Sequence, residues 1–415
     1  MADFVNQIVP AITPQEVCAV PSTPSYQSVA IRELPPPTRP LRLAIVRQQY
    51  KADGGAERFT ASLIAALGEN RYDVTVLARR WQRHDGASAV RCNPPRLGRL
   101  SRDWGFALSV ARELKHRRFD LVQSNERVPG CDVYRAGDGV HRQWLVHRRR
   151  AQSLPARLMS AVSPYHAYLQ WAERRVFEHP KLRAVICNSR MVRDEILKYF
   201  RIDPAKLHVI YNSVDARRFG PYLTHHRSAV RAEFGIPPAA PLFVFVGSGF
   251  ERKGLRYAIE GLTGVLQAHL LIIGGDKQSP QYVRLAQKLG VAGRTHFAGV
   301  RSDVGPCYGA ADALLLPTLY DPMPNVALEA MASGLPLLVS PACGAAELLG
   351  ETSDGGPCGL VCDPLDHSAL VSAMHRLTDL SFAERLGNAA RRRVEPLTPE
   401  AMVAQLTALY RRLLT

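Results

Sequence analysis

The chain has 415 residues, of which 46% are apolar, and its 53 basic and 37 acidic side chains leave a formal net charge of +16. This length exceeds what one hydrophobic core can serve and suits two domains of roughly 150 to 200 residues each. No run of about 18 apolar residues occurs, and no basic segment followed by an apolar core opens the sequence, so we expect a cytoplasmic protein without a membrane span or secretory signal.

The basic surplus narrows the range of partners without selecting one. Such a surface attracts polyanions, among them nucleic acid, anionic lipid headgroups and phosphorylated glycans. The eight cysteines are scattered through a long chain, which fits a reducing compartment. Cys358 and Cys362 are four positions apart, but no second Cys or His pair accompanies them, so we expect no metal site there.

Residues 1–40 are rich in proline without a helical or strand period, which predicts a flexible extension to which we assign no function. Beyond them, short apolar strands alternate with helical patterns, which predicts βαβ units and an α/β fold with parallel sheets. The strands are expected at residues 41–46, 73–77, 120–123, 184–187, 208–211, 242–247, 270–274, 313–316 and 337–340.

A glycine pair follows the first predicted strand and opens a helix. Gly54 and Gly55 would let the backbone approach a ligand closely while the helix N-terminal amides face it. An ordinary tight turn between a strand and a helix is the alternative. This segment lacks the Gly-x-Gly-x-x-Gly that a dinucleotide-dependent dehydrogenase would need.

Basic and aromatic side chains alternate between residues 142 and 175. Such a mixture suits an anionic membrane surface, with rings at headgroup depth and charges on the lipid. The same composition would suit single-stranded RNA, and a solvated helix face with core aromatics is a third interpretation. The residues concerned are Arg142, His147, Arg148, Arg149, Arg150, Arg157, Arg174 and Arg175, with Trp144, Tyr165, Tyr168 and Trp171.

A second glycine-rich turn follows the strand predicted at 242–247. We expect Arg252 and Lys253 at the start of the next helix, after Ser248. Basic side chains there oppose the helix dipole, and a bound anion would remove that conflict. Two solvated charges are the alternative interpretation.

Two carboxylates, Asp321 and Glu329, lie eight positions apart between an apolar strand and a helix. The helix is expected to begin near Asn325, which places Glu329 about one turn into it and Asp321 in the preceding loop. Ligands of open α/β sheets bind at helix N-termini beside the carboxyl ends of strands. Both acids are therefore placed to bind hydroxyl groups.

This acidic pair resembles the signature of the retaining family-4 glycosyltransferases, which has two Glu residues separated by seven positions. The resemblance spans about residues 41–395 and implies the GT-B fold, two Rossmann-like domains with parallel sheets facing across a cleft. It implies that Glu329 binds the ribose of a sugar nucleotide and that Asp321 lies beside the transferred sugar. Here the first acid is Asp rather than Glu, and Pro322 and Pro324 replace the usual small residues.

The resemblance also implies the remaining donor contacts. The loop with Gly54 and Gly55 would cover the donor phosphates and sugar, and Arg252 and Lys253 would hold the diphosphate. Ser248, Arg301, Asn325 and Val326 complete the expected donor-binding set. By the same resemblance, the segments at 185–189 and 209–215 close the first domain, and Asn212, Val214, Asp215 and Phe219 shape the hinge.

The stretch from Ser124 to Asp138 is similar to the lipopolysaccharide core glucosyltransferases that act on an inner-core heptose. This narrower resemblance makes Asp138, between Gly137 and Gly139, and His141 the titratable candidates on the acceptor side. Either could equally be an ordinary polar loop residue.

We therefore predict a flexible extension at 1–40, an acceptor-side domain at 41–220, a nucleotide-sugar domain at 221–398, and a C-terminal helix at 399–415 that, by resemblance, packs back. The expected activity moves sugar from a UDP-sugar, such as UDP-glucose, to a lipopolysaccharide core or other lipid-linked glycan at the inner face of the membrane. No cofactor is implied, and because no Asp-x-Asp occurs we expect no metal. A nucleic-acid-binding protein, or a family-4 enzyme acting on a capsule or exopolysaccharide precursor, are the alternatives.

Overall fold

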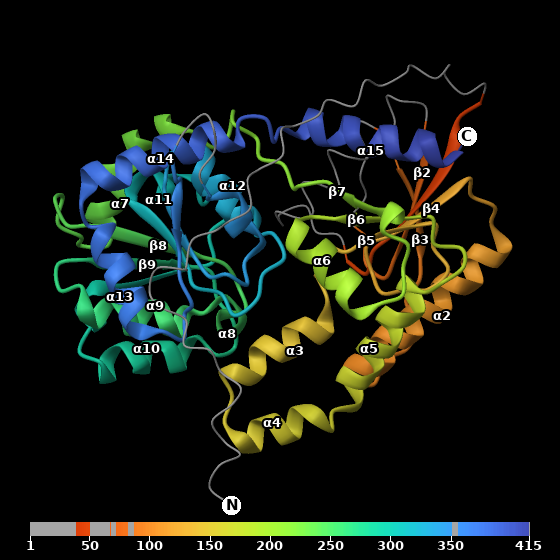
Figure 1. Ribbon diagram of the computed structural model, residues 1–415, viewed down its shortest axis with the longest axis horizontal. Coiled ribbons are helices and arrows are strands. Elements are labelled where there is room, and N and C mark those ends of the chain that lie inside the picture. The colour runs from red at the N-terminus through yellow and green to blue at the C-terminus, as the bar shows by residue number, and fades with distance from the viewer. Residues whose placement is uncertain (1–38, 50–66, 68–71, 82–86, 351–355, 415) are drawn as a thin grey trace, which may run out of the picture.

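The computed structural model describes residues 39–49, 67, 72–81, 87–350 and 356–414 (Figure 1). Within these ranges the chain forms two parallel β-sheets, each surrounded by helices. The α/β fold with parallel sheets, predicted from the alternation of strands and helices, and the two Rossmann-like sheets, implied by the resemblance, are confirmed. Residues 1–38 of the predicted extension lie outside the described residues.

In the described part of the chain, the first sheet has seven strands in the order β3-β2-β1-β4-β5-β6-β7. Every pairing is parallel, so no two neighbouring strands are joined by a tight hairpin turn. The strands are β1 (Leu41–Val46), β2 (Tyr72–Ala78), β3 (Ala87–Arg91), β4 (Leu121–Ser124), β5 (Val133–Arg135), β6 (Ala184–Cys187) and β7 (Leu207–Val209).

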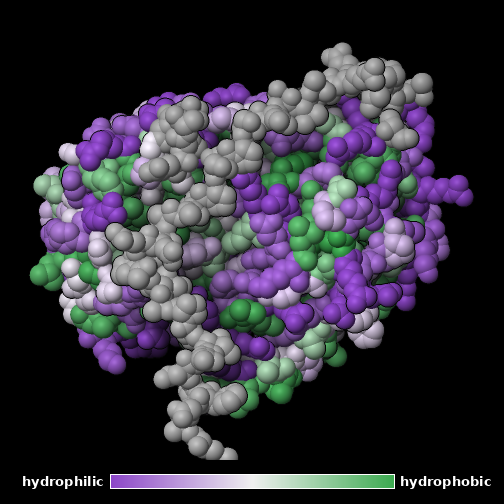
Figure 2. Space-filling view, in the orientation of Figure 1, coloured by the Kyte–Doolittle hydropathy of each residue, from purple (hydrophilic) through white to green (hydrophobic). Residues whose placement is uncertain are grey.

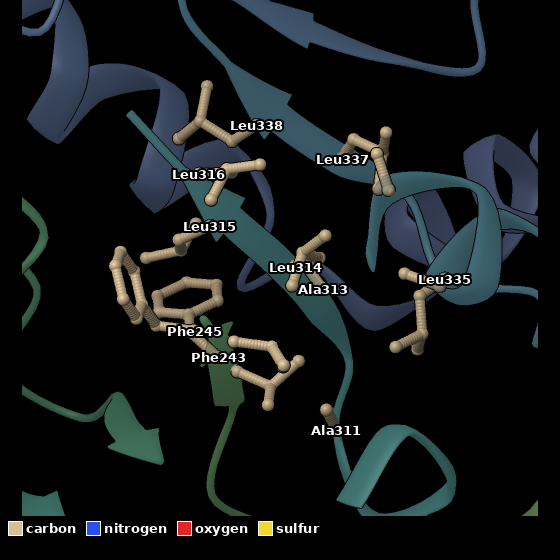
Figure 3. Close-up of a cluster of buried hydrophobic side chains, with 14 of the residues drawn as sticks. Phe243, Phe245, Ala311, Ala313, Leu314, Leu315, Leu316, Leu335, Leu337 and Leu338 are labelled. Atoms are coloured by element: carbon tan, nitrogen blue, oxygen red, sulfur yellow. The ribbon is translucent and has the colours of Figure 1, made fainter. Parts of the chain in front are cut away.

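The second sheet has six described strands in the order β10-β9-β8-β11-β12-β13, again all parallel. All residues of β8 and β11 are buried, as expected of central strands covered on both faces. Their side chains and those of β12 form one apolar cluster (Figure 3). The strands are β8 (Leu242–Val246), β9 (His269–Ile273), β10 (Thr295–Gly299), β11 (Ala313–Leu316), β12 (Leu337–Val339) and β13 (Gly359–Val361).

Helices connect and cover the strands of both sheets (Figure 1). Those on the first-sheet side are α2 (Gly98–His116), α3 (His141–Arg150), α4 (Leu154–Ala161), α5 (Pro164–Phe177) and α6 (Arg190–Tyr199), with the short 3-10 helix η1 (Pro204–Lys206). Those on the second are η2 (Pro221–His226), α7 (Arg227–Glu233), α8 (Phe250–Lys253), α9 (Leu255–Gly261), η3 (Leu262–Gly264), α10 (Ser279–Lys288), η4 (Ala292–Arg294), α11 (Gly305–Ala310), α12 (Asn325–Ala332), η5 (Gly344–Leu348), α13 (His367–Arg376) and α14 (Leu380–Val394).

The last helix, α15 (Pro399–Leu414), packs on the first sheet although it follows the second in the chain (Figure 1). Its Leu406 and Tyr410 share a core with Leu43 and Ile45 of β1. The segment that leads into α15 contacts the segment that follows β7, where the Val214 amide donates to the Leu397 carbonyl at 2.9 Å. The domain limits at residues 220 and 398 stay predictions.

Candidate active site

A cavity of about 500 Å³ lies between the two sheets and takes its lining from both. The lining residues follow the carboxyl ends of the strands, where open parallel sheets bind ligands. Polar side chains lie on both walls. They include Glu126, Asp138, Asn188 and Asn212 from the first-sheet side, and Lys253, Asn325 and Glu329 from the second.

Glu329 lies one turn into α12, as predicted, and its buried carboxylate lines the cavity. The Tyr308 hydroxyl of α11 donates to Glu329 Oε2 at 3.0 Å, which fixes the carboxylate. Asn325 and Val326 form the first turn of α12 and also line the cavity. No side chain caps this N-terminus within the described residues, so its first amides and the positive end of the helix dipole can face an anion.

Arg252 and Lys253 end the short helix α8 and do not open a helix, so the predicted position of this basic pair was wrong. Gly254, with a φ of 78°, separates them from α9 because a left-handed residue interrupts the helical hydrogen bonding. Both residues still lie next to the N-terminus of α9, whose N-cap is Gly254. Their charges meet a different partner, the carboxylate of Asp321.

The Lys253 ammonium is buried, lines the cavity and lies 3.0 Å from Asp321 Oδ2. Arg252 reaches the same oxygen at 3.3 Å. The stem of Lys253 crosses Gly247, where an added Cβ would lie 2.6 Å from Lys253 Cδ. A side chain at position 247 would displace the lysine stem, and the φ of 142° also favours glycine there.

Asp321 itself is buried and is not among the described residues that line the cavity. Its amide donates to the Ala342 carbonyl at 3.0 Å, and its carbonyl accepts from the Gly344 amide at 2.8 Å, so the backbone is fixed on both sides. The structure thus brings Asp321 to the site as the partner of Lys253 and Arg252.

Asp138 and His141, the two candidates on the acceptor side, have different surroundings. The Asp138 side chain is 73% exposed, lines the cavity and lies 3.5 Å from Arg127. His141 is the first residue of α3 and is buried, with its Nε2 3.0 Å from His166 Nδ1. It is not among the described residues that line the cavity. Burial and the nearby charge of Arg127 lower the pKa of His141 to about 3, so the ring is neutral at physiological pH.

The other predicted donor contacts lie farther from the cavity lining. Ser248 is exposed in the loop before α8. Arg301 pairs with Glu233 at the end of α7 and lies over the Phe234 ring, 5.2 Å from its centroid. Neither residue lines the cavity in the described structure. Gly54 and Gly55 lie outside the described residues.

Several lining residues were not predicted as ligand contacts. Asn212, interpreted as a hinge residue, donates to Asn325 Oδ1 at 2.7 Å and accepts from the half-buried guanidinium of Arg135 at 2.8 Å. Glu126 accepts from the Gln48 amide at 2.9 Å, and burial raises the pKa of its carboxyl to about 7. The remaining predicted hinge residues, Val214, Asp215 and Phe219, also line the cavity.

Tyr320 of the second-sheet side makes hydrogen bonds to residues of the first-sheet side. Its buried hydroxyl accepts from the Val140 amide at 2.9 Å and donates to Glu195 Oε2 of α6 at 2.5 Å. The rings of Trp144 and His147 in α3 stack on the Tyr320 ring. The loop that holds Asp321 is thereby joined to the loop that holds Asp138.

Helix α3 makes two further ion pairs with the second-sheet side. Arg148 lies 3.0 Å from Glu251, and Arg150 lies 2.5 Å from Asp363. The sequence had predicted these arginines as part of one basic and aromatic surface. In the structure, Arg148 and Arg150 lie at the contact between the two sheets, because α3 lies between the sheets (Figure 1).

Two facing parallel sheets with a cavity between their carboxyl edges are the arrangement of the GT-B fold. Residues 53–218 match the domain described as Glycosyltransferase Family 4, and residues 240–379 match the domain described as Glycosyl transferases group 1. The chain therefore belongs to the glycosyltransferases that join a family 4 domain to a group 1 domain.

Three relatives illustrate the similarity. The lipopolysaccharide glucosyltransferase WaaG of Escherichia coli is 25% identical over 80% of this chain and 88% of its own length. Its crystal structure superposes with a TM-score of 0.75 at 24% identity, covering 88% of this chain and 99% of that one. The lipopolysaccharide core biosynthesis glycosyltransferase LpsE of Rhizobium meliloti is 25% identical over 90% of this chain and 99% of its own. Anabaena HepE in complex with UDP-glucose gives a TM-score of 0.65 at 18% identity, covering 90% and 100% of the chains.

Proposed function

We propose that the protein is a retaining hexosyltransferase that moves a sugar from UDP-glucose or another UDP-sugar to a lipopolysaccharide core or other lipid-linked glycan, without a metal. The observation that supports this most directly is that Lys253, Glu329 and the open N-terminus of α12 face one cavity. The relatives add support, because two are named for lipopolysaccharide synthesis and the third was solved with UDP-glucose.

Each side of the cavity has a chemical role in this proposal. Glu329, held by Tyr308, accepts hydrogen bonds from the ribose hydroxyls. Lys253, Arg252 and the first amides of α12 offset the negative charge that develops on the departing diphosphate, which is the usual task of cations and helix dipoles in such sites. Asp138, on the opposite wall, orients the acceptor hydroxyl. The acceptor oxygen bonds to the anomeric carbon on the same face from which the diphosphate departs, as the bond from that carbon to the diphosphate breaks. The departing phosphate takes the hydroxyl proton.

The test is incubation of the pure protein with a panel of nucleotide sugars in the presence of EDTA. We expect slow hydrolysis of one UDP-sugar, unchanged by EDTA, because protein cations and helix amides stabilise the leaving group. Hydrolysis lost with EDTA and restored by Mg²⁺ or Mn²⁺ would contradict the metal-independent mechanism. RNA binding at matched salt without UDP binding would favour the nucleic-acid alternative.

We further propose attachment to the inner face of the cell membrane through α4, which lies within the basic and aromatic segment at residues 142–175. The apolar residues Leu154, Leu158, Met159 and Val162 recur along α4 and its C-terminal end, and each is at least 71% exposed. The helix lies at the lower edge of the molecule, where hydrophobic residues reach the surface (Figures 1 and 2). No helix in the described part of the chain is long and apolar enough to cross a bilayer.

Membrane attachment is expected to depend more on α4 than on the arginines of α3. Each fully buried Leu contributes roughly 1.5 to 3 kcal/mol, whereas a basic residue near an anionic surface contributes about 1 kcal/mol. The double variant L158S/M159S should sediment less with anionic vesicles, and R148S/R150S should sediment like wild type because both arginines already pair with Glu251 and Asp363. L266S, a change at a 75% exposed apolar residue of the second-sheet side, is the matched control. Wild-type sedimentation by L158S/M159S would contradict the proposal.

A further inference from the structure

A chain of three hydrogen-bonded side chains crosses from the first sheet to the second-sheet wall of the cavity. Arg135 is the last residue of β5, Asn212 follows β7, and Asn325 is the first residue of α12. Arg135 Nη2 donates to Asn212 Oδ1 at 2.8 Å, and Asn212 Nδ2 donates to Asn325 Oδ1 at 2.7 Å. All three residues line the cavity, so the chain ends where the donor diphosphate is proposed to lie.

The direction of this chain is fixed at its start, because a guanidinium group has five N–H donors and no acceptor. Burial lowers the pKa of Arg135 to about 10, so the group is still protonated at neutral pH. The Asn212 atom that faces Arg135 must therefore be the carbonyl oxygen. The Met323 carbonyl oxygen, 3.0 Å from Asn212 Nδ2, requires the same orientation because a carbonyl only accepts.

The fixed orientation of Asn212 decides what Asn325 offers to a ligand. Asn212 presents an N–H, so Asn325 accepts it with Oδ1, and its own Nδ2 lies on the other side of the carboxamide. Among the described residues none accepts a hydrogen bond from Asn325 Nδ2, although Asn325 lines the cavity. Asn325 therefore offers the cavity amide donors and keeps its carbonyl oxygen occupied.

This polarity matters for a phosphate and not for a hydroxyl group. A hydroxyl both donates and accepts, so it pairs with either end of an amide. A phosphate oxygen that carries negative charge only accepts, so it pairs with Nδ2 and is repelled by Oδ1. Lys253 and the first turn of α12, which no described side chain caps, border the same cavity and also favour an anion.

We propose that Arg135 and Asn212 are positioning residues that hold Asn325 with its amide donors toward the diphosphate of the donor. This inference rests on the proposed transferase function. The first-sheet side thereby takes part in recognising the diphosphate, although the second-sheet side supplies the lysine and the helix N-terminus. Asn212 has this role in addition to the hinge role that the resemblance implies.

The variant N212D reverses the chain, because a carboxylate only accepts. Arg135 keeps its partner, but Asn325 has to donate Nδ2 to the new carboxylate and turn Oδ1 toward the ligand. We expect N212D to weaken UDP binding by roughly tenfold or more in isothermal titration calorimetry, the effect of losing a hydrogen bond to a charged group. N388D adds the same charge at an exposed position of α14 and should bind UDP like wild type.

A double-mutant cycle with N325A separates the loss of polarity from direct repulsion by the new charge. If Asn212 acts through Asn325, N212D should change UDP affinity by less than about twofold in the N325A background. Equal losses in the wild-type and N325A backgrounds would show repulsion through space and overturn the inference. So would wild-type affinity for UDP in N212D.

The variant N212A repeats the cycle without any added charge and serves if N212D does not fold. It frees Asn325 to rotate, so it should weaken UDP binding severalfold in the wild-type background and have no further effect in N325A. An effect of N212A that persists in N325A would overturn the inference.

Uridine distinguishes positioning from a merely structural role, because it carries the ribose hydroxyls without a phosphate. NMR titration should show the same uridine binding in wild type and N212D, and the two proteins should have similar melting temperatures. A loss of uridine binding equal to the loss of UDP binding would overturn the inference.

The wild-type protein separates this inference from the proposed function. If UDP does not bind to wild type, the proposed function itself fails. If UDP binds and a UDP-sugar is hydrolysed as expected, while N212D and N325A bind UDP like wild type, only the positioning role fails.

Discussion

Replacing Lys253 or Glu329 is expected to abolish sugar transfer while the protein stays folded. Losing a charge-assisted contact in such a site costs about 2 to 4 kcal/mol of transition-state stabilisation. For Lys253, K253M keeps the aliphatic stem that packs over Gly247 and removes only the charge. For Glu329, E329Q keeps the volume and an acceptor for the Tyr308 hydroxyl. Transfer rates and melting temperatures of the variants are the measurements.

The ion pair between Lys253 and Asp321 allows a second interpretation to be tested. If Lys253 only neutralised the buried Asp321, the double variant K253M/D321N would recover activity, because neither charge would remain. If Lys253 contacts the diphosphate, the double variant stays inactive. R256A, which removes an exposed partner of Glu260 on the next helix, is the control for a basic residue outside the cavity. Wild-type turnover by folded K253M and E329Q would contradict the donor-site assignment.

The central strands could be predicted from the sequence because burial on both faces requires continuous apolar residues. Strands β8 and β11 are of this kind, and both were predicted at or within one residue of their observed limits. Among the described strands, four were not predicted, β3, β5, β10 and β13, and these are short or contain exposed residues. Their conformation depends on pairing with a neighbour strand more than on local propensity, which a single sequence does not display.

The candidate site was predictable where its residues act through local structure. The helix that begins at Asn325 places Glu329 one turn along, and this follows from residue spacing alone. The break after Lys253 did not follow, because the left-handed Gly254 packs where a Cβ would lie 1.8 Å from the Pro317 carbonyl oxygen. Contacts such as Asn212 with Asn325 join residues 113 positions apart, so only the packing of the two sheets brings them together.

Gly139→Ala is expected to lower both the melting temperature and the transfer rate, because this glycine lets the Tyr320 hydroxyl reach the Val140 amide. An added Cβ would lie 2.1 Å from Tyr320 Oη, and Gly139 has a φ of 68°. The left-handed backbone costs roughly 1 to 2 kcal/mol for alanine. Separating the Tyr320 hydroxyl from the Val140 amide and the Glu195 carboxylate leaves these buried polar groups without hydrogen-bond partners. Each such loss destabilises the fold by about 1 to 3 kcal/mol.

Gly235→Ala is the matched control for backbone strain, since Gly235 has a φ of 63° but nothing within 4 Å of an added Cβ. Tyr320→Phe removes the hydroxyl without adding a clash, so it isolates the hydrogen bonds. If Tyr320 positions Asp138 relative to Lys253, both G139A and Y320F should lower kcat while UDP binding persists, because Glu329 and Lys253 stay in place. G235A should lose stability only. If G139A matches G235A in melting temperature and keeps wild-type transfer, the link through Tyr320 does not position the site.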